Sequence, residues 1–124
     1  MDFFREQPPG RQLIQGYQEG GFRIAGVRHE GSVLVLPDRT LAWPASNLDQ
    51  VTLGLLAPVL AAAPAIEILV LGCGRHFAMA SADLRQTLRA EGVALESMDT
   101  PAACRTYNVL LADERRVAAA LIAL

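Results

Sequence analysis

The stretch Ile66-Glu67-Ile68-Leu69-Val70-Leu71-Gly72-Cys73-Gly74 decides the fold class of this 124-residue chain. Apart from Glu67 it is an unbroken aliphatic run, and it ends in a Gly-x-Gly turn. An apolar run without alternation is typical of a strand that is buried on both faces, as in an α/β sheet. We therefore expect this strand to lie inside a central sheet.

The residues that follow predict a βαβ unit. Ser81 is a favourable N-cap for a helix over 82–91, and Gly92 stands where a left-handed residue commonly ends a helix. A second strand is expected over 93–98, and Asp99-Thr100-Pro101 then begins another helix, with proline at its first position. Strand, helix and strand in this order form a parallel pair with a right-handed crossover.

The N-terminal half is expected to add a β-hairpin. Residues 22–27 alternate at first, Glu30-Gly31 makes a turn, and the apolar run over 32–36 returns as the more central strand. A short strand over 40–43 is stopped by Pro44. The chain is thus predicted to be an α/β protein with a mixed, partly parallel sheet.

Two other segments are less regular. A helix from Thr52 to about Ala62 is expected to start late or to bend at Pro58, because proline removes a backbone donor. The tail over 117–124 is short, apolar and rich in alanine, so it fits a helix or a buried strand. We expect a loosely ordered arm over residues 1–12 and a single α/β domain over residues 13–124.

The composition excludes several classes of function. The net charge is −2 and the pI is near 5.6, so we expect no nucleic-acid partner. No apolar run reaches membrane-spanning length and the first residues lack a signal-peptide pattern, so we expect no membrane insertion and a cytoplasmic location. Two cysteines and two histidines show no metal-ligand spacing, so neither a metal site nor a cofactor is expected.

The loop over 72–81 is the most distinctive candidate for binding. Gly72-Cys73-Gly74 begins like a dinucleotide fingerprint, but Phe77 stands where the third glycine is required. The loop is long for a βα connection, and it leaves the end of the strand where α/β sheets place ligands. Arg75 and His76 could supply positive charge for binding, whereas Phe77 and Met79 suggest that part of the loop is packed against the protein. The alternative is an ordered loop with a structural role only, in which Arg75 and His76 are solvated.

The two cysteines are expected at one edge of the sheet, because each follows the end of one of two parallel strands. A helix start lowers the pKa of a thiol such as Cys104, and His76 is the nearest base to Cys73 in the sequence. A buried, inert and reduced state is nevertheless favoured for both thiols, so no catalytic residue is assigned. Thr100 is interpreted as a helix cap and Asn108 as a surface residue. The candidate surface comprises Gly72, Cys73, Gly74, Arg75, His76, Thr100, Cys104, Arg105 and Asn108.

Six blocks of sequence occur together in a recognisable order: Gly-Gly-Phe-Arg-Ile at 20–24, Gly-Ser-Val-Leu-Val-Leu-Pro at 31–37, Leu-Gly-Cys-Gly-Arg at 71–75, Met-Asp-Thr at 98–100, Ala-Cys-Arg-Thr-Tyr-Asn-Val-Leu at 103–110 and Arg-Arg-Val-Ala-Ala-Ala-Leu at 115–121. Over residues 12–124 the chain resembles the Mth938-type domain family, a domain of unknown function whose members include a mitochondrial assembly factor of NADH dehydrogenase (complex I). The resemblance implies a compact three-layer α/β fold, whose last strand lies at about 116–122 and runs antiparallel to its neighbours.

Two positions depart from the pattern of this family. The family often has Gly-Thr-Gly where this chain has Gly72-Cys73-Gly74, so a catalytic thiol at position 73 is not implied. The family often has Glu-Gly where this chain has Asp113-Glu114, so Glu114 must adopt or avoid a left-handed conformation. The family carries no established catalytic residues.

The resemblance implies a non-catalytic binding protein, an assembly or biogenesis factor for respiratory membrane complexes that acts on a protein partner. The alternative is a protein that binds a small ligand or anion with the loop over 72–81 and the helix start at Thr100. A cysteine-dependent enzyme is the less favoured third interpretation.

Overall fold

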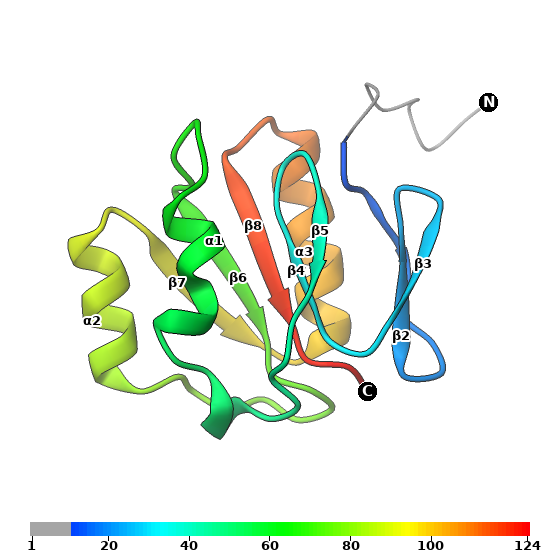
Figure 1. The fold of residues 1–124 in the computed structure, drawn as a ribbon, viewed down its shortest axis with the longest axis horizontal. Helices are drawn as coiled ribbons and strands as arrows, with labels where there is room; N and C mark the ends of the chain where they lie inside the picture. Colours follow the sequence, from blue (N-terminus) through cyan, green and yellow to red (C-terminus); the bar gives the residue numbers. More distant parts are fainter. Residues whose placement is uncertain (1–10) are drawn as a thin grey trace.

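The apolar run that ends in Gly72 forms β6 (Ile68–Gly72), a strand inside a five-stranded sheet with the order β5-β4-β8-β6-β7 (Figure 1). A computed structural model describes this sheet and the rest of residues 11–124. β6 pairs in parallel with β7 (Ala94–Met98), and α2 (Ala82–Ala90) connects the two strands. The predicted βαβ unit is therefore confirmed.

The ambiguous tail is a strand, β8 (Val117–Leu121), and all five of its residues are buried. It lies between β6, to which it is parallel, and β4 (Val33–Val35), to which it is antiparallel. The expectation that the last strand runs antiparallel to its neighbours is therefore wrong for β6. α3 (Thr100–Ala112) crosses over the sheet between β7 and β8, so the chain enters β8 in the same direction as β6 and β7.

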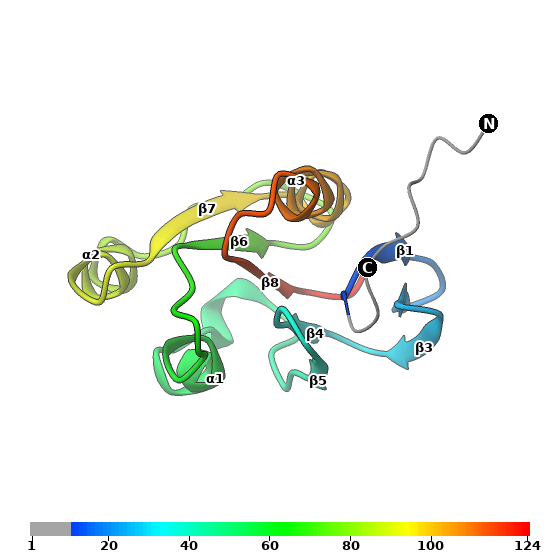
Figure 2. The same cartoon turned by 90° about the horizontal axis from the view of Figure 1, so that it is seen from above.

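Different elements cover the two faces of this sheet, which gives three layers (Figure 2). α3 packs on one face, where Val70 and Tyr107 share a core with buried residues of the smaller sheet. α1 (Ala57–Leu60) and α2 lie over the other face, where Leu69 and Leu71 belong to a second core. Because β6 is covered on both faces, it is apolar at successive positions rather than at alternate ones.

The N-terminal hairpin differs from the prediction in its turn and in its second strand. β2 (Gly21–Ile24) pairs antiparallel with β3 (Val27–Glu30) around Ala25 and Gly26, which both have positive φ, as a type I′ turn requires. The run expected to return beside β2 is instead β4, which pairs with β5 (Thr40–Ala42) and β8 in the larger sheet. Alanine gives little sequence signal for a left-handed turn, whereas Glu30-Gly31 gives a strong one, so the turn was predicted too late in the chain.

Several shorter elements complete the described residues. β1 (Ile14–Gly16) pairs with β2 as the edge of the three-stranded sheet. Two single-turn 3₁₀ helices, η1 (Leu48–Gln50) and η2 (Gly54–Leu56), precede α1. Pro58 lies at the start of α1, so this helix begins late, as predicted.

The predicted N-terminal arm lies outside the described residues except for Arg11 and Gln12. The Arg11 guanidinium donates to the carbonyl of Leu111 at the end of α3. Gln12 is buried, and its side-chain oxygen accepts a hydrogen bond from the Thr40 hydroxyl at 2.8 Å. These two contacts join the start of the described chain to α3 and to β5.

Candidate functional site

Thr100 is the centre of the edge at which β6 and β7 end. Its side chain is fully buried; its hydroxyl accepts from the Gly74 N–H at 2.9 Å and donates to the Ile122 carbonyl at 2.7 Å. The Ile122 N–H in turn donates to the Gly72 carbonyl at 3.0 Å. One hydroxyl therefore joins the loop after β6, the start of α3 and the residue that follows β8. We call this arrangement of Gly72, Gly74, Thr100 and Ile122 the Thr100 clasp.

The interpretation of Thr100 as a helix cap is wrong, because Asp99 has that role. The Asp99 carboxylate accepts a hydrogen bond from the Ala102 N–H at 2.8 Å, and Asp99 itself has extended backbone geometry. Aspartate is as good an N-cap as any residue, and Pro101 is tolerated early in a helix. The cap could therefore have been assigned to Asp99 from the sequence; the role of the Thr100 hydroxyl could not.

Packing against Thr100 explains the Gly-x-Gly sequence. A Cβ atom at Gly72 would lie 2.9 Å from Thr100 Oγ1 and 3.0 Å from Thr100 Cα, which is closer than van der Waals contact allows. Gly74 has a φ of +97°, a conformation that other residues rarely adopt. Both glycines are thus required by the clasp, which supports the tight-turn interpretation of this motif.

The backbone donors at the start of α3 are already engaged. The Thr100 N–H donates to the Gly74 carbonyl at 2.8 Å, Pro101 has no N–H, and the Ala102 N–H is bound by the Asp99 carboxylate. The Ala103 N–H donates to the Asp99 carbonyl at 2.9 Å. An anion at this helix start would have to displace these partners and approach a carboxylate, so the geometry gives the anion hypothesis no support.

The loop over 72–81 presents its middle residues to solvent. Arg75 and His76 are exposed, and Phe77 and Met79 expose 59% and 54% of their surface. The prediction that Phe77 and Met79 are packed down is therefore wrong. Other residues hold the loop: Ala80 is buried, and the Cys73 thiol lies 3.1 Å from the Ala78 carbonyl, to which it donates.

The two cysteines are not brought together. Cys73 packs into the core beneath α1 and α2, whereas Cys104 belongs to the core beneath α3, so the two free thiols lie on opposite faces of the sheet. Burial raises the pKa of the Cys104 thiol to about 12, and it also raises the pKa of Cys73. The expected lowering of the pKa by the helix start is wrong, because desolvation outweighs it at Cys104. Cys104 is buried and Cys73 is half-buried, and in both environments the pKa of the thiol is raised rather than lowered.

The remaining candidates on α3 have separate roles. Asn108 is half-buried, and its side chain is bonded in a way that the sequence did not predict: its Oδ1 accepts from the Ile14 N–H at 3.0 Å, and its Nδ2 donates to the Ile14 carbonyl at 2.7 Å. This pair of bonds attaches β1 to α3. Arg105 is exposed, one residue along from the buried Cys104.

Across residues 11–124, no three His, Cys, Asp or Glu side chains gather in a position to hold a metal ion. No helix within the same range has the length and apolarity needed to cross a bilayer.

Known proteins resemble this chain over most of its length. NADH dehydrogenase [ubiquinone] 1 alpha subcomplex assembly factor 3 of Danio rerio is 36% identical over 98% of this chain and 70% of that protein. A crystal structure from Bartonella henselae, described as an outer membrane protein, superposes with a TM-score of 0.84 at 36% identity, covering 93% of this chain and 97% of that one. The solution structure of a Mth938-like domain from Bordetella pertussis has a TM-score of 0.81 at 27% identity, covering 98% and 91%.

These similarities agree with the resemblance that the sequence blocks predict. The family described as protein of unknown function (DUF498/DUF598) matches residues 14–122. The Mth938-like neighbour shares the fold over nearly the whole chain, so the predicted resemblance is confirmed. The chain belongs to the DUF498/DUF598 family.

Proposed function

We propose that this chain is an assembly factor that binds a subunit of a respiratory NADH dehydrogenase before that subunit joins its complex. The observation that carries the proposal is the 36% identity, over 98% of the chain, to a protein named as an assembly factor of NADH dehydrogenase. Under this proposal the protein acts in the cytoplasm, where it would bind the newly synthesised partner subunit.

The geometry of the candidate surface supports binding over catalysis. A cysteine-dependent enzyme needs an activated thiol, whereas burial raises the pKa of both thiols here. The exposed loop instead combines Arg75 with Phe77 and Met79, and arginine, aromatic residues and methionine are enriched at protein–protein interfaces.

The candidate residues divide into two groups under this proposal. The exposed side chains Arg75, His76 and Arg105, together with Phe77 and Met79, would contact the partner. The buried or half-buried candidates would hold the loop and α3 in position, and they are Gly72, Cys73, Gly74, Thr100, Cys104 and Asn108.

The test is genetic and biochemical. Deleting the gene in its own host should lower the amount of assembled NADH dehydrogenase on native gels, and the tagged protein should crosslink to one of that enzyme's subunits. Phe77→Ala combined with Arg75→Ala should weaken this crosslink at an unchanged melting temperature. The control variant combines Val27→Ala with Arg85→Ala, an apolar residue and an arginine that are also exposed but lie elsewhere, and it should leave the crosslink unchanged. Unchanged levels of the assembled enzyme in the deletion strain would contradict the proposal.

The small-ligand alternative has a separate readout. Titration with inorganic phosphate, followed by thermal melting, should leave the melting temperature unchanged, because the donors at the start of α3 are engaged. A saturable rise in melting temperature that Arg75→Ala removes would favour the anion-binding function.

A further inference from the structure

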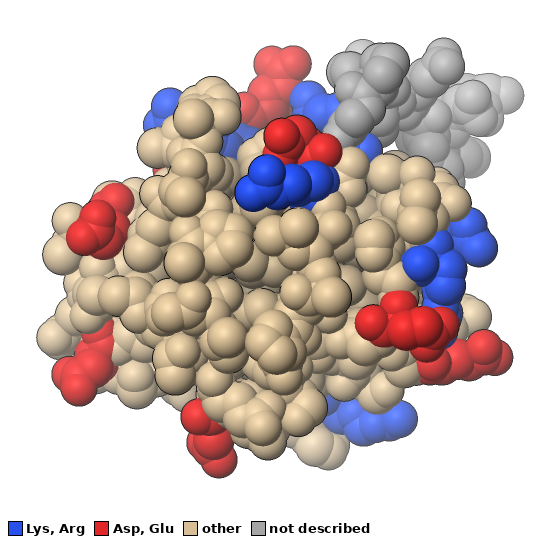
Figure 3. Space-filling model, in the orientation of Figure 1, with Lys and Arg blue, Asp and Glu red and all other residues tan. Residues whose placement is uncertain are grey.

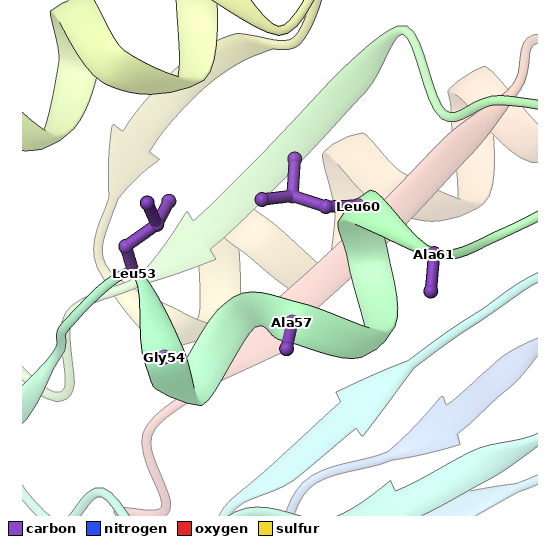
Figure 4. Close-up of a pocket in the computed structure, with 5 residues that line it drawn as sticks. All are labelled: Leu53, Gly54, Ala57, Leu60 and Ala61. Carbon is purple, nitrogen blue, oxygen red and sulfur yellow. The ribbon is translucent and has the colours of Figure 1, made fainter.

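Five residues whose side chains lack a polar atom line a hollow over η2 and α1: Leu53, Gly54, Ala57, Leu60 and Ala61 (Figure 4). The face that carries α1 is uncharged over its centre, and its charged side chains stand at the rim (Figure 3). A second copy, a lipid and a partner helix would all make the same apolar contacts here, so this lining does not select an occupant. A site whose own polar atoms define the ligand lies instead beside α3.

The start of the described chain forms a joint with the C-terminal half of α3. The Arg11 guanidinium donates to the Leu111 carbonyl, and three residues later the backbone of Ile14 is bonded twice by the Asn108 side chain. Tyr107 lies one helical turn before Leu111, and both residues belong to the same core as Ile14. The chain therefore passes along the face of α3 that carries Tyr107.

Two buried polar atoms at this joint have no hydrogen-bond partner among residues 11–124. They are Nε of Arg11 and the hydroxyl of Tyr107. Tyr107 is 0% exposed, so its hydroxyl is out of reach of bulk solvent. Buried polar groups in folded proteins are nearly always bonded, because an unpaired group has lost its hydration without compensation. A third group is therefore expected to satisfy these two atoms.

Arg11 and Tyr107 are close enough to interact electrostatically. Burial raises the pKa of the Tyr107 phenol, and the positive charge of Arg11 opposes this rise. The ion pairs within residues 11–124 involve other arginines, so no carboxylate of the described chain neutralises Arg11. The two unpaired atoms are thus neighbours, and no described carboxylate satisfies either of them.

Size, charge and hydrogen-bonding capacity restrict what can satisfy this pair. Tyr107 is enclosed by the core, so the occupant must be small. A cation would be repelled by the guanidinium of Arg11. An anion would stand close to the carbonyl groups that end α3, where the helix dipole is negative and Arg11 already donates to Leu111. Arg11 Nε can only donate, whereas a phenol can donate or accept, so the occupant must offer an acceptor. A water molecule meets all of these conditions.

We propose that one ordered water molecule is bound between Arg11 Nε and the Tyr107 hydroxyl. The water accepts a hydrogen bond from Nε and forms a second one with the phenol, so both buried groups are satisfied. Buried polar sites that supply such partners hold waters that are part of the structure and costly to remove. The bound water fixes the start of the described chain on α3. This site lies apart from the loop over 72–81, and it does not depend on the assembly-factor function.

The direction of the stability change in Tyr107→Phe tests this proposal. If the hydroxyl is bonded to a bound water, its removal breaks that bond, and we expect the melting temperature to fall by about 4 °C. If the hydroxyl is buried without a partner, its removal relieves an uncompensated desolvation cost, and the melting temperature should rise. The control Tyr17→Phe removes the hydroxyl of a half-buried tyrosine and should change the melting temperature by about 1 °C or less.

The water itself can be detected in the purified protein. A high-resolution crystal structure should show density within hydrogen-bonding distance of both Arg11 Nε and the Tyr107 hydroxyl. In solution, NMR of isotope-labelled protein should give cross-peaks from water to the Arg11 Nε–H and to the Tyr107 ring, with the sign expected of a long-lived internal water. Tyr107→Phe should weaken the cross-peak at Arg11, whereas Tyr17→Phe should leave it unchanged.

Three results would overturn the proposal. A rise in the melting temperature of Tyr107→Phe would show that the hydroxyl is buried without a partner. A fall without water density between the two atoms would show that Arg11 and Tyr107 bond to each other directly. A saturable rise in the melting temperature with sodium chloride or sodium formate, lost in Tyr107→Phe, would assign the site to an anion. These measurements use purified protein, so their failure is distinguishable from failure of the assembly-factor proposal, which is tested by enzyme levels in cells.

Discussion

The substitution Thr100→Val tests whether the Thr100 clasp holds the edge of the sheet together. Valine has nearly the shape of threonine, so packing is kept while both hydrogen bonds of the hydroxyl are lost. The Gly74 N–H and the Ile122 carbonyl would then be buried without a partner. An unsatisfied buried group costs about 1–3 kcal/mol, so after allowing for the hydroxyl's own desolvation we expect a loss of about 3 kcal/mol. For a chain of this size that corresponds to a fall in melting temperature of roughly 10 °C.

The assay is chemical denaturation of four proteins: the parent, Thr100→Val, Thr100→Ser and Thr106→Val. Serine keeps the hydroxyl and loses one methyl group, so Thr100→Ser should cost only about 1 kcal/mol. Thr106 is half-buried on the same helix, and valine there should change stability by about 0.5 kcal/mol or less. Hydrogen exchange of the Gly74 amide should also accelerate in Thr100→Val alone. If Thr100→Val proves at least as stable as Thr100→Ser, packing rather than hydrogen bonding explains why threonine is buried here, and the clasp has no energetic role.

Two further predictions follow from local features. Glu114, two residues after the end of α3, has a φ of +61°, and its N–H donates to the Leu111 carbonyl. Because glycine adopts this conformation without strain, Glu114→Gly should stabilise the protein by about 0.5–1 kcal/mol in the same denaturation assay. The control is Glu91→Gly after α2, where φ is −88°, and this substitution should not increase stability. Burial raises the pKa of Cys104 to about 12, so iodoacetamide at mildly alkaline pH should not modify this thiol in the folded protein. After unfolding in guanidinium, both cysteines should be modified. Rapid modification of Cys104 in the folded protein would show that this thiol is not inert.

The βαβ unit could be predicted because its signals are local. The Ser81 hydroxyl caps α2 by accepting from the Leu84 N–H at 3.1 Å, and Gly92 has the expected left-handed conformation, with a φ of +84°. Each of these features depends on residues within one helical turn. The continuous apolar run likewise indicates that β6 is buried on both faces, and this inference does not require knowing which strands pair with β6.

Features that depend on distant residues could not be predicted in this way. The Thr100 hydroxyl bonds to residues 26 and 22 positions away, and no local pattern marks it. The same holds for Asn108, whose partner Ile14 is 94 positions away. The pairing of β4 with β8 rather than with β2 also joins distant segments, and the hairpin prediction failed because a glycine turn signal near residue 30 outweighed the weaker signal of Ala25-Gly26.

The clasp also bears on what the loop after β6 can recognise. A dinucleotide-binding loop presents its backbone N–H groups to a pyrophosphate, but here the Gly74 N–H is bound by the Thr100 hydroxyl and the Cys73 N–H by the Met98 carbonyl. The N–H groups of the Gly-x-Gly turn are therefore engaged within the protein, and the exposed side chains of the loop are Arg75, His76, Phe77 and Met79. These side chains can be replaced without disturbing the buried clasp. A turn whose backbone donors are engaged, beside exposed arginine, aromatic and methionine side chains, suits the binding of a protein surface better than the binding of a phosphate.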